Sequence, residues 1–148
     1  MKKVKVFTDG ACSRNPGPGG WGVLIIYNKK EKELFGGEKQ TTNNRMELKA
    51  AIEALKYFKE PTTIEINTDS MYLKNGITEW IISWKKNNWK NSSKKTIKNY
   101  DLWIELDNLI HIHKLSWKWI KAHSGNYGNE KADQLANRGI LSINKKSL

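Results

Sequence analysis

One six-residue pattern occurs twice and constrains the fold more than any other feature of the chain. Residues 4–9 (VKVFTD) and 64–69 (IEINTD) both read aliphatic-x-aliphatic-x-Thr-Asp. This alternation predicts a β-strand with its aliphatic side chains on one face. A single aspartate at a strand end often serves only a turn or a helix cap. A matched pair predicts two strands that bring Asp9 and Asp69 to one edge of a sheet, where α/β proteins bind ligands.

The other periodicities complete one α/β domain over residues 1–148. Strands are predicted at 3–8, 21–27, 33–38, 63–68 and 115–120. Helices are predicted at about 43–59, 70–75, 77–86, 100–111 and 129–138, the last ended by Gly139. Turns or loops are expected at 12–22, 87–99 and 122–128. This order predicts a mixed five-stranded sheet, an antiparallel meander extended by parallel crossover strands and flanked by helices.

Glu47 does not fit the helical stripe on which it lies. The stripe continues through Ala51, Ala54 and Phe58 and should face the sheet. A buried carboxylate must be paired or bind a cation, because isolated burial is costly. A salt bridge to a buried Arg or Lys is the alternative explanation. Glu53, on the opposite side, is expected to be a surface charge paired with nearby lysines.

Asp133 lies in the first turns of the last predicted helix, where a negative charge also favours the helix dipole. If it converges with Asp9, Glu47 and Asp69, their mutual repulsion calls for a cation. Ligands that are all oxygen indicate Mg²⁺ or Mn²⁺ rather than zinc. Two such ions about 4 Å apart can hydrolyse a phosphodiester.

The charge of the chain favours polyanions. Twenty-six basic residues face fifteen acidic ones, a net charge of +11, although a lysine-rich composition also suits an AT-rich genome. Residues 77–98 hold three tryptophans and six lysines but one acid, Glu79. Lysines beside aromatic rings suit a phosphate backbone, whereas Trp80 and Trp84 can also anchor a helix to the core. No apolar run of about 18 residues, no signal peptide and a single cysteine, Cys12, predict a cytoplasmic protein without a membrane span.

Several motifs together resemble ribonuclease H of the bacterial type I family. They are FTDGAC (7–12), NPGPGGWG (15–22), TNNRMEL (42–48), TDS (68–70), WKWIKAHSG (117–125) and NEKAD (129–133). The resemblance covers residues 3 to about 138. It implies an endonuclease that cuts the RNA strand of RNA–DNA hybrids, leaves 5′-phosphate and 3′-hydroxyl ends, and removes RNA primers and R-loops during DNA replication.

The resemblance also implies roles for individual residues. Asp9 would bridge two Mg²⁺ ions, for which Mn²⁺ can substitute, and Glu47, Asp69 and Asp133 would complete their shells. His123 would assist proton transfer or product release, and Asn129 would support the site. Positions that match hybrid contacts are Cys12, Asn15, Asn43 and Asn44 in the minor groove and Thr42 on a DNA phosphate.

Residues 77–99 resemble the basic handle with which members grip the DNA strand. Its candidate contacts are Trp80, Lys85, Lys86, Trp89 and Lys90. One position departs from the family pattern: Met71 stands where members often carry a glutamine that helps bind the hybrid, so we expect altered substrate contact there.

Two other functions remain open at this point. A related nuclease or integrase-like domain would share the fold and act on another substrate. A non-catalytic module would bind hybrids without cutting them, but it would have no need of four mutually repelling acids. Nothing in the sequence indicates an oligomer, so we expect a monomer.

Overall fold

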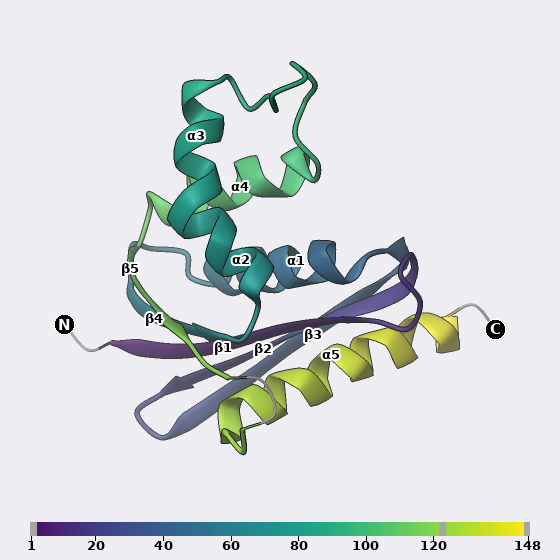
Figure 1. Ribbon diagram of the computed structural model, residues 1–148. Coiled ribbons are helices and arrows are strands. Elements are labelled where there is room, and N and C mark those ends of the chain that lie inside the picture. Colours follow the sequence, from purple (N-terminus) through teal and green to yellow (C-terminus); the bar gives the residue numbers. More distant parts are fainter. Residues whose placement is uncertain (1–2, 122–123, 147–148) are drawn as a thin grey trace.

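The computed structural model describes residues 3–121 and 124–146 and has a five-stranded sheet with helices on both faces. Helices α1 to α4 lie on one side of the sheet and α5 lies on the other (Figure 1). The strands are β1 (Val4–Cys12), β2 (Gly17–Tyr27), β3 (Lys30–Thr41), β4 (Thr63–Thr68) and β5 (Lys114–Trp119). The helices are α1 (Asn43–Lys56), α2 (Met71–Asn75), α3 (Ile81–Lys86), α4 (Tyr100–Ile110) and α5 (Tyr127–Lys146).

The strand order β3-β2-β1-β4-β5 confirms the predicted mixed sheet. β1 pairs antiparallel with β2, which pairs antiparallel with β3. On its other side β1 runs parallel to β4, and β4 runs parallel to β5. The two repeated segments are therefore adjacent strands, with Val6 opposite Ile66 and Phe7 opposite Asn67.

Alternation along β1 divides the core between the two faces of the sheet. Val4 and Val6 belong to the large buried cluster, together with Ile64 and Ile66 of β4 and the apolar residues of α1. Phe7 points the other way and packs with Leu24 and with Ala132 of α5. None of the described helices is both long enough and apolar enough to span a membrane.

The helical segment after β4 continues through Gly76, which was expected to interrupt it. A π-helical turn (Gly76–Trp80) joins α2 to α3. A Cβ at Gly76 would lie 1.9 Å from the ring of Trp103, so the glycine allows α4 to approach closely. Trp103 is fully buried.

Two of the boundaries that differ from the prediction lie near glycines, which serve packing there rather than turns or caps. β2 begins at Gly17, inside the expected turn at 12–22, and α5 continues past Gly139, its expected end. A Cβ at Gly139 would lie 2.0 Å from the Gly36 carbonyl oxygen, and one at Gly20 would lie 2.1 Å from the Ala136 carbonyl oxygen. These glycines let α5 lie directly on the β2–β3 hairpin.

Replacing Gly139 by alanine therefore tests a packing role against a helix-ending role. Helix propensity alone would stabilise the protein by about 1 kcal/mol, whereas a clash with the strand backbone costs about 1–3 kcal/mol. We expect a lower urea midpoint, measured by circular dichroism. Gln134→Ala, at an exposed position of the same helix, is the control and should change the midpoint little. A higher midpoint for Gly139→Ala would contradict the packing role.

Candidate active site

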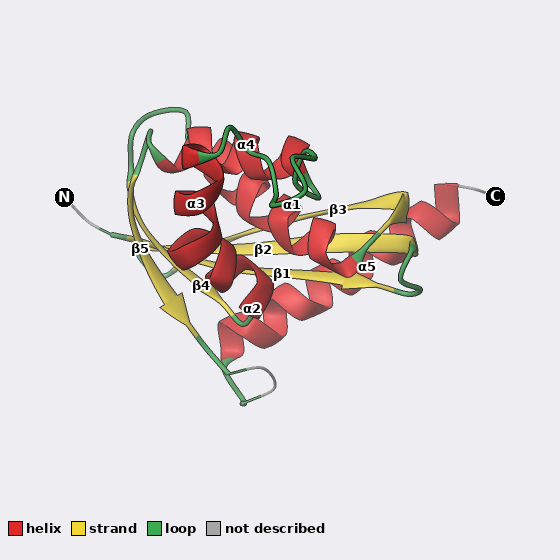
Figure 2. Ribbon diagram, turned by 45° about the horizontal axis from the view of Figure 1, so that its top comes forward, coloured by secondary structure: helices red, strands yellow, loops and turns green. Residues whose placement is uncertain are grey.

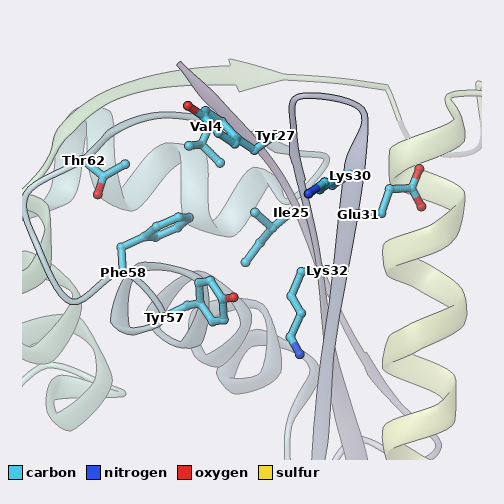
Figure 3. A pocket seen from close by; sticks show the side chains of 9 residues that line it. All are labelled: Val4, Ile25, Tyr27, Lys30, Glu31, Lys32, Tyr57, Phe58 and Thr62. Atoms are coloured by element: carbon cyan, nitrogen blue, oxygen red, sulfur yellow. The ribbon is translucent and has the colours of Figure 1, made fainter. Parts of the chain in front are cut away.

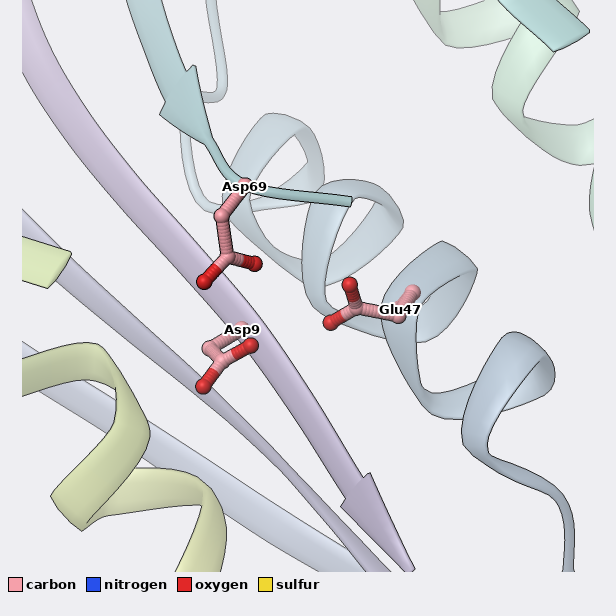
Figure 4. Close-up of side chains that lie close together, drawn as sticks. All are labelled: Asp9, Glu47 and Asp69. Carbon is pink, nitrogen blue, oxygen red and sulfur yellow. The ribbon is translucent and has the colours of Figure 1, made fainter. Parts of the chain in front are cut away.

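Three carboxylates meet beside β1, where the neighbouring strand β4 ends. Asp9 comes from β1, Asp69 directly follows β4, and Glu47 comes from the first turns of α1. One oxygen from each lies within 4.8 Å of the others, and Figure 4 shows the three side chains converging from their separate elements. Because β1 and β4 run parallel in the register Phe7–Asn67, the repeated Thr-Asp pairs lie side by side, as the sequence predicted, although β1 continues to Cys12 and does not end before Asp9.

Gly10 explains how α1 comes close enough to present Glu47. A Cβ at Gly10 would lie 2.4 Å from the backbone nitrogen of Glu47, so only glycine fits beneath the helix. The Gly10 N–H donates a hydrogen bond to Oε1 of Glu47. The helix begins at a cap, where the Thr42 hydroxyl accepts from the Arg45 N–H at 3.2 Å. Glu47 is thus fixed against the end of β1 by backbone contacts.

Asp133 extends the site from the opposite side of the sheet. It lies in α5, partly buried, and lines the same cavity as Asp9 and Asp69. It is close enough to Asp9 to help raise the pKa of that carboxyl, but it is not one of the three whose oxygens meet within 4.8 Å. Asp9, Asp69 and Asp133 therefore line one cavity, and Glu47 adjoins it through its contact with Asp9 and Asp69.

Burial and mutual repulsion govern the electrostatics of the cluster. Burial raises the pKa of Asp9 well above its usual range, and the charges of Glu47 and Asp69 raise it further. Burial likewise raises the pKa of Glu47, helped by Asp69 and opposed by hydrogen bonds from its neighbours. Among the side chains described, those of residues 3–121 and 124–143, no Lys or Arg forms an ion pair with any of the four carboxylates. A salt bridge to a buried base is thus not what holds Glu47 there, whereas Glu53 pairs with Lys49 and Lys56 as expected.

The donor set of the cavity fits a hard cation. The cavity is about 280 Å³ and is also lined by Cys12, Asn43, Asn129 and Glu130. Asn129 is buried, and its side-chain oxygen has no hydrogen-bond partner among the described atoms. Carboxylate and amide oxygens are the ligands that Mg²⁺ and Mn²⁺ prefer. Glu130 was not singled out from the sequence, where an acid in the first turn of a helix is ordinary.

A larger cavity, about 480 Å³, lies away from the carboxylates. Figure 3 shows its lining, with Val4, Ile25 and Tyr27 from the sheet and Tyr57 and Phe58 just after α1. It lies where β1 begins, whereas Asp9 is near the other end of that strand. Its largely apolar wall offers no cluster of metal ligands.

The five predicted hybrid contacts outside the handle gather around the acidic cavity. Cys12 and Asn43 line it. The Asn15 side chain accepts a hydrogen bond from the Asn43 N–H at 3.1 Å, and Asn44 is exposed beside it. Thr42 caps α1. The turn after β1 and the start of α1 thus form one polar rim next to the carboxylates.

The handle residues divide into anchors and free lysines. Trp84 packs on Trp80, Trp89 and the buried Trp103, with ring centroids 5.4–6.2 Å apart. Lys85 pairs with the buried Asp107 at 3.3 Å. Lys86 and Lys90 are exposed.

Three other predictions concern single residues. Met71 is 61% exposed and lies two residues after Asp69. Asn129, where the last helix was expected to begin, lies inside α5, and the Asn126 side chain accepts a hydrogen bond from its N–H. His123 lies outside the described residues.

Comparison with known proteins agrees with this geometry. A model of the RNase H family matches residues 1–141. The chain belongs to the ribonuclease H family. As a member of this family it is an endoribonuclease.

Bacterial relatives align over nearly the whole chain. Ribonuclease H of Alcanivorax borkumensis is 56% identical over 146 residues, covering 99% of this chain and 97% of the relative. Ribonuclease HI of Pseudomonas putida is 57% identical over 140 residues, covering 95% of each. Among solved structures, LC9-RNase H1 has a TM-score of 0.85 at 32% identity, over 95% of this chain and 72% of that one. LC11-RNase H1 in complex with an RNA/DNA hybrid has a TM-score of 0.68 at 25% identity, over 95% and 98%.

Proposed function

We propose that the chain hydrolyses the RNA strand of RNA–DNA hybrids at the cluster of Asp9, Glu47, Asp69 and Asp133, leaving 5′-phosphate and 3′-hydroxyl ends. The observation that carries the proposal is the convergence of Asp9, Glu47 and Asp69 without a basic partner among the described residues. The family and a relative solved with an RNA/DNA hybrid support the choice of substrate.

Asp9, Glu47, Asp69 and Asp133 would hold the cofactor, which we propose is a pair of Mg²⁺ ions, with Mn²⁺ as a substitute. Bound there, such ions supply an activated water and stabilise the leaving oxygen of a phosphodiester. The buried, unpartnered oxygen of Asn129 borders the same space and supports the ligand set. His123, between β5 and α5 in the sequence, is proposed to assist proton transfer or product release.

Recognition of RNA would come from the polar rim beside the carboxylates. Cys12, Asn15, Asn43 and Asn44 are proposed to face the minor groove, where the 2′-hydroxyl distinguishes RNA from DNA. Thr42 would bind a phosphate of the DNA strand. The monomeric state, the cytoplasmic location and the removal of primers and R-loops during replication belong to the same proposal.

The handle yields a test in which paired and free lysines behave differently. Lys86→Gln combined with Lys90→Gln should raise KM several-fold and flatten its salt dependence, because up to two phosphate contacts are lost, while kcat changes little. Lys85→Gln should instead lower the urea midpoint, because it leaves the buried Asp107 without its lysine. Steady-state cleavage at several salt concentrations and urea unfolding measure both. An unchanged salt dependence in the double variant would refute handle binding.

The proposed substrate is tested with three labelled duplexes of one sequence: an RNA–DNA hybrid, duplex RNA and duplex DNA. We expect Mg²⁺-dependent cutting of the hybrid's RNA strand alone. Cutting of duplex DNA alone would indicate an integrase-like substrate. Tight hybrid binding without cutting would indicate a binding module.

A further inference from the structure

Helix α5 covers only part of its side of the sheet. It packs on β1, β2 and β3, and β5 lies at the edge of the sheet (Figure 2). Side chains of β5 alternate accordingly. Leu115 and Trp117 pack against the large core on the α1 side, whereas Lys114, Ser116 and Lys118 are exposed on the α5 side.

The strand register extends this side of the sheet across three strands, on which Lys5, Ser116 and Lys118 are exposed, whereas Phe7 and Asn67 are buried. Lys118 stands opposite Asn67, which stands opposite Phe7. Ser116 stands opposite Glu65, which stands opposite Lys5. Because partners in a parallel pair point to the same side and Phe7 packs with Ala132 of α5, these rows all face the α5 side.

The surface is strongly basic. We call its exposed lysines, Lys3, Lys5, Lys114 and Lys118, the lysine face. The acid among them, Glu65, is partly buried, lies 3.9 Å from the Lys3 ammonium, and accepts a hydrogen bond from the Asn67 amide. No carboxylate of the described residues forms an ion pair with Lys5, Lys114 or Lys118.

The lysine face begins next to the carboxylate cluster. Phe7, Asn67 and Lys118 stand opposite one another on three neighbouring strands. Asp9 and Asp69 come two residues after Phe7 and Asn67, so this row of residues lies immediately before the cluster. Lys118 is on β5 and Asp9 is on β1, with β4 between them. In the direction perpendicular to the strands their backbones are therefore about 10 Å apart. The handle helices lie on the opposite side of the sheet (Figure 1). The acidic site therefore lies between two basic regions.

We propose that the lysine face holds the phosphate backbone of the bound hybrid on the side of the active site opposite the handle. The inference rests on the proposed function, since it takes the hybrid as the ligand. Charge complementarity supports a nucleic acid, because unpaired lysines release counterions on meeting phosphates. A protein partner is disfavoured, because protein interfaces are depleted of lysine.

The test removes three lysines of the face: Lys5→Gln, Lys114→Gln and Lys118→Gln in one chain. The matched control is Lys29→Gln, Lys30→Gln and Lys59→Gln, three exposed lysines with the same change of charge. Steady-state cleavage gives KM and kcat. Fluorescence anisotropy of labelled hybrid with each triple variant in an Asp9→Asn background gives Kd without turnover. Each is measured at several salt concentrations, and urea unfolding checks that all variants fold.

We expect the lysine-face variant to bind the hybrid about tenfold more weakly, with the slope of log Kd against log salt lowered by about 2–3, and with kcat unchanged. In a variant that also carries Lys86→Gln and Lys90→Gln, the fold-change in Kd should equal the product of the fold-changes caused by the lysine face and by the handle, because the two surfaces are separate. A Kd and salt slope equal to those of the control would overturn the proposal. Failure of the wild type to cut the hybrid would refute the proposed function instead, and the anisotropy data would still decide the lysine face.

Discussion

Replacing Asp9 by asparagine is expected to lower kcat for hybrid cleavage by roughly 10³–10⁴-fold, the scale of loss for single groups at hydrolytic centres. Asp9 lies in the cluster with Glu47 and Asp69, and these two carboxyls and Asp133 all act to raise its pKa. The amide keeps the size of the side chain but removes the charge that would hold a divalent ion. Binding of the hybrid, measured by anisotropy, should be unchanged or tighter, because a negative charge next to the phosphates is lost.

The control for this prediction is Glu53→Gln, which removes one negative charge from α1 outside the carboxylate cluster. Glu53 pairs only with surface lysines, so its loss should leave kcat within about a factor of two. Glu47→Gln, six residues earlier in the same helix, should resemble Asp9→Asn. If Asp9→Asn retained near-normal kcat, the assignment of the site would be wrong.

The same Asp9→Asn variant should be more stable than the wild type when divalent metal is absent. Burial and neighbouring charges raise the pKa of Asp9 in the folded state above its unfolded value. Because the pKa of Asp9 is higher in the folded state than in the unfolded state, its contribution to stability is fully present only below the unfolded-state pKa. That contribution is lost as the pH rises through the folded-state pKa. At pH 7 the metal-free wild type therefore carries a cost that the amide does not, on the order of 2–4 kcal/mol.

Thermal unfolding in a chelator, at pH values from about 4 to 8, measures this difference. The gap between variant and wild type should be smallest near pH 4 and should widen toward neutral pH, because the unfolded wild type then loses its proton first. Added Mg²⁺ should raise the wild-type Tm and leave the variant's nearly unchanged. A variant less stable than the wild type at pH 7 without metal would contradict the repulsion inferred at the cluster.

The carboxylates could be predicted to different degrees, each for a physical reason. Asp9 and Asp69 followed from a pattern that specifies adjacent parallel strands, and the structure pairs those strands. Glu47 followed from a charge on an apolar stripe, and it is buried among that stripe. The position of Asp133 has no local signature and depended on the family resemblance.

Other features depend on tertiary contacts that local patterns do not encode. Gly139 was expected to end a helix, but it allows close packing on Gly36 of β3. Lys85 was expected to bind DNA, and that role is still a proposal, but the lysine pairs with Asp107 from a different helix. The lysine face could not be predicted, because it depends on which strands α5 leaves uncovered.

The measurement that tests the central claim most directly is cleavage of a hybrid with separately labelled RNA and DNA strands, with and without Mg²⁺, by the wild type and by Asp9→Asn. We predict that the wild type cuts only the RNA strand and only with the metal present, and that Asp9→Asn binds the hybrid without cutting it. Equal cutting in a chelator, or cutting of the DNA strand, would contradict a metal-dependent ribonuclease built on these four carboxylates.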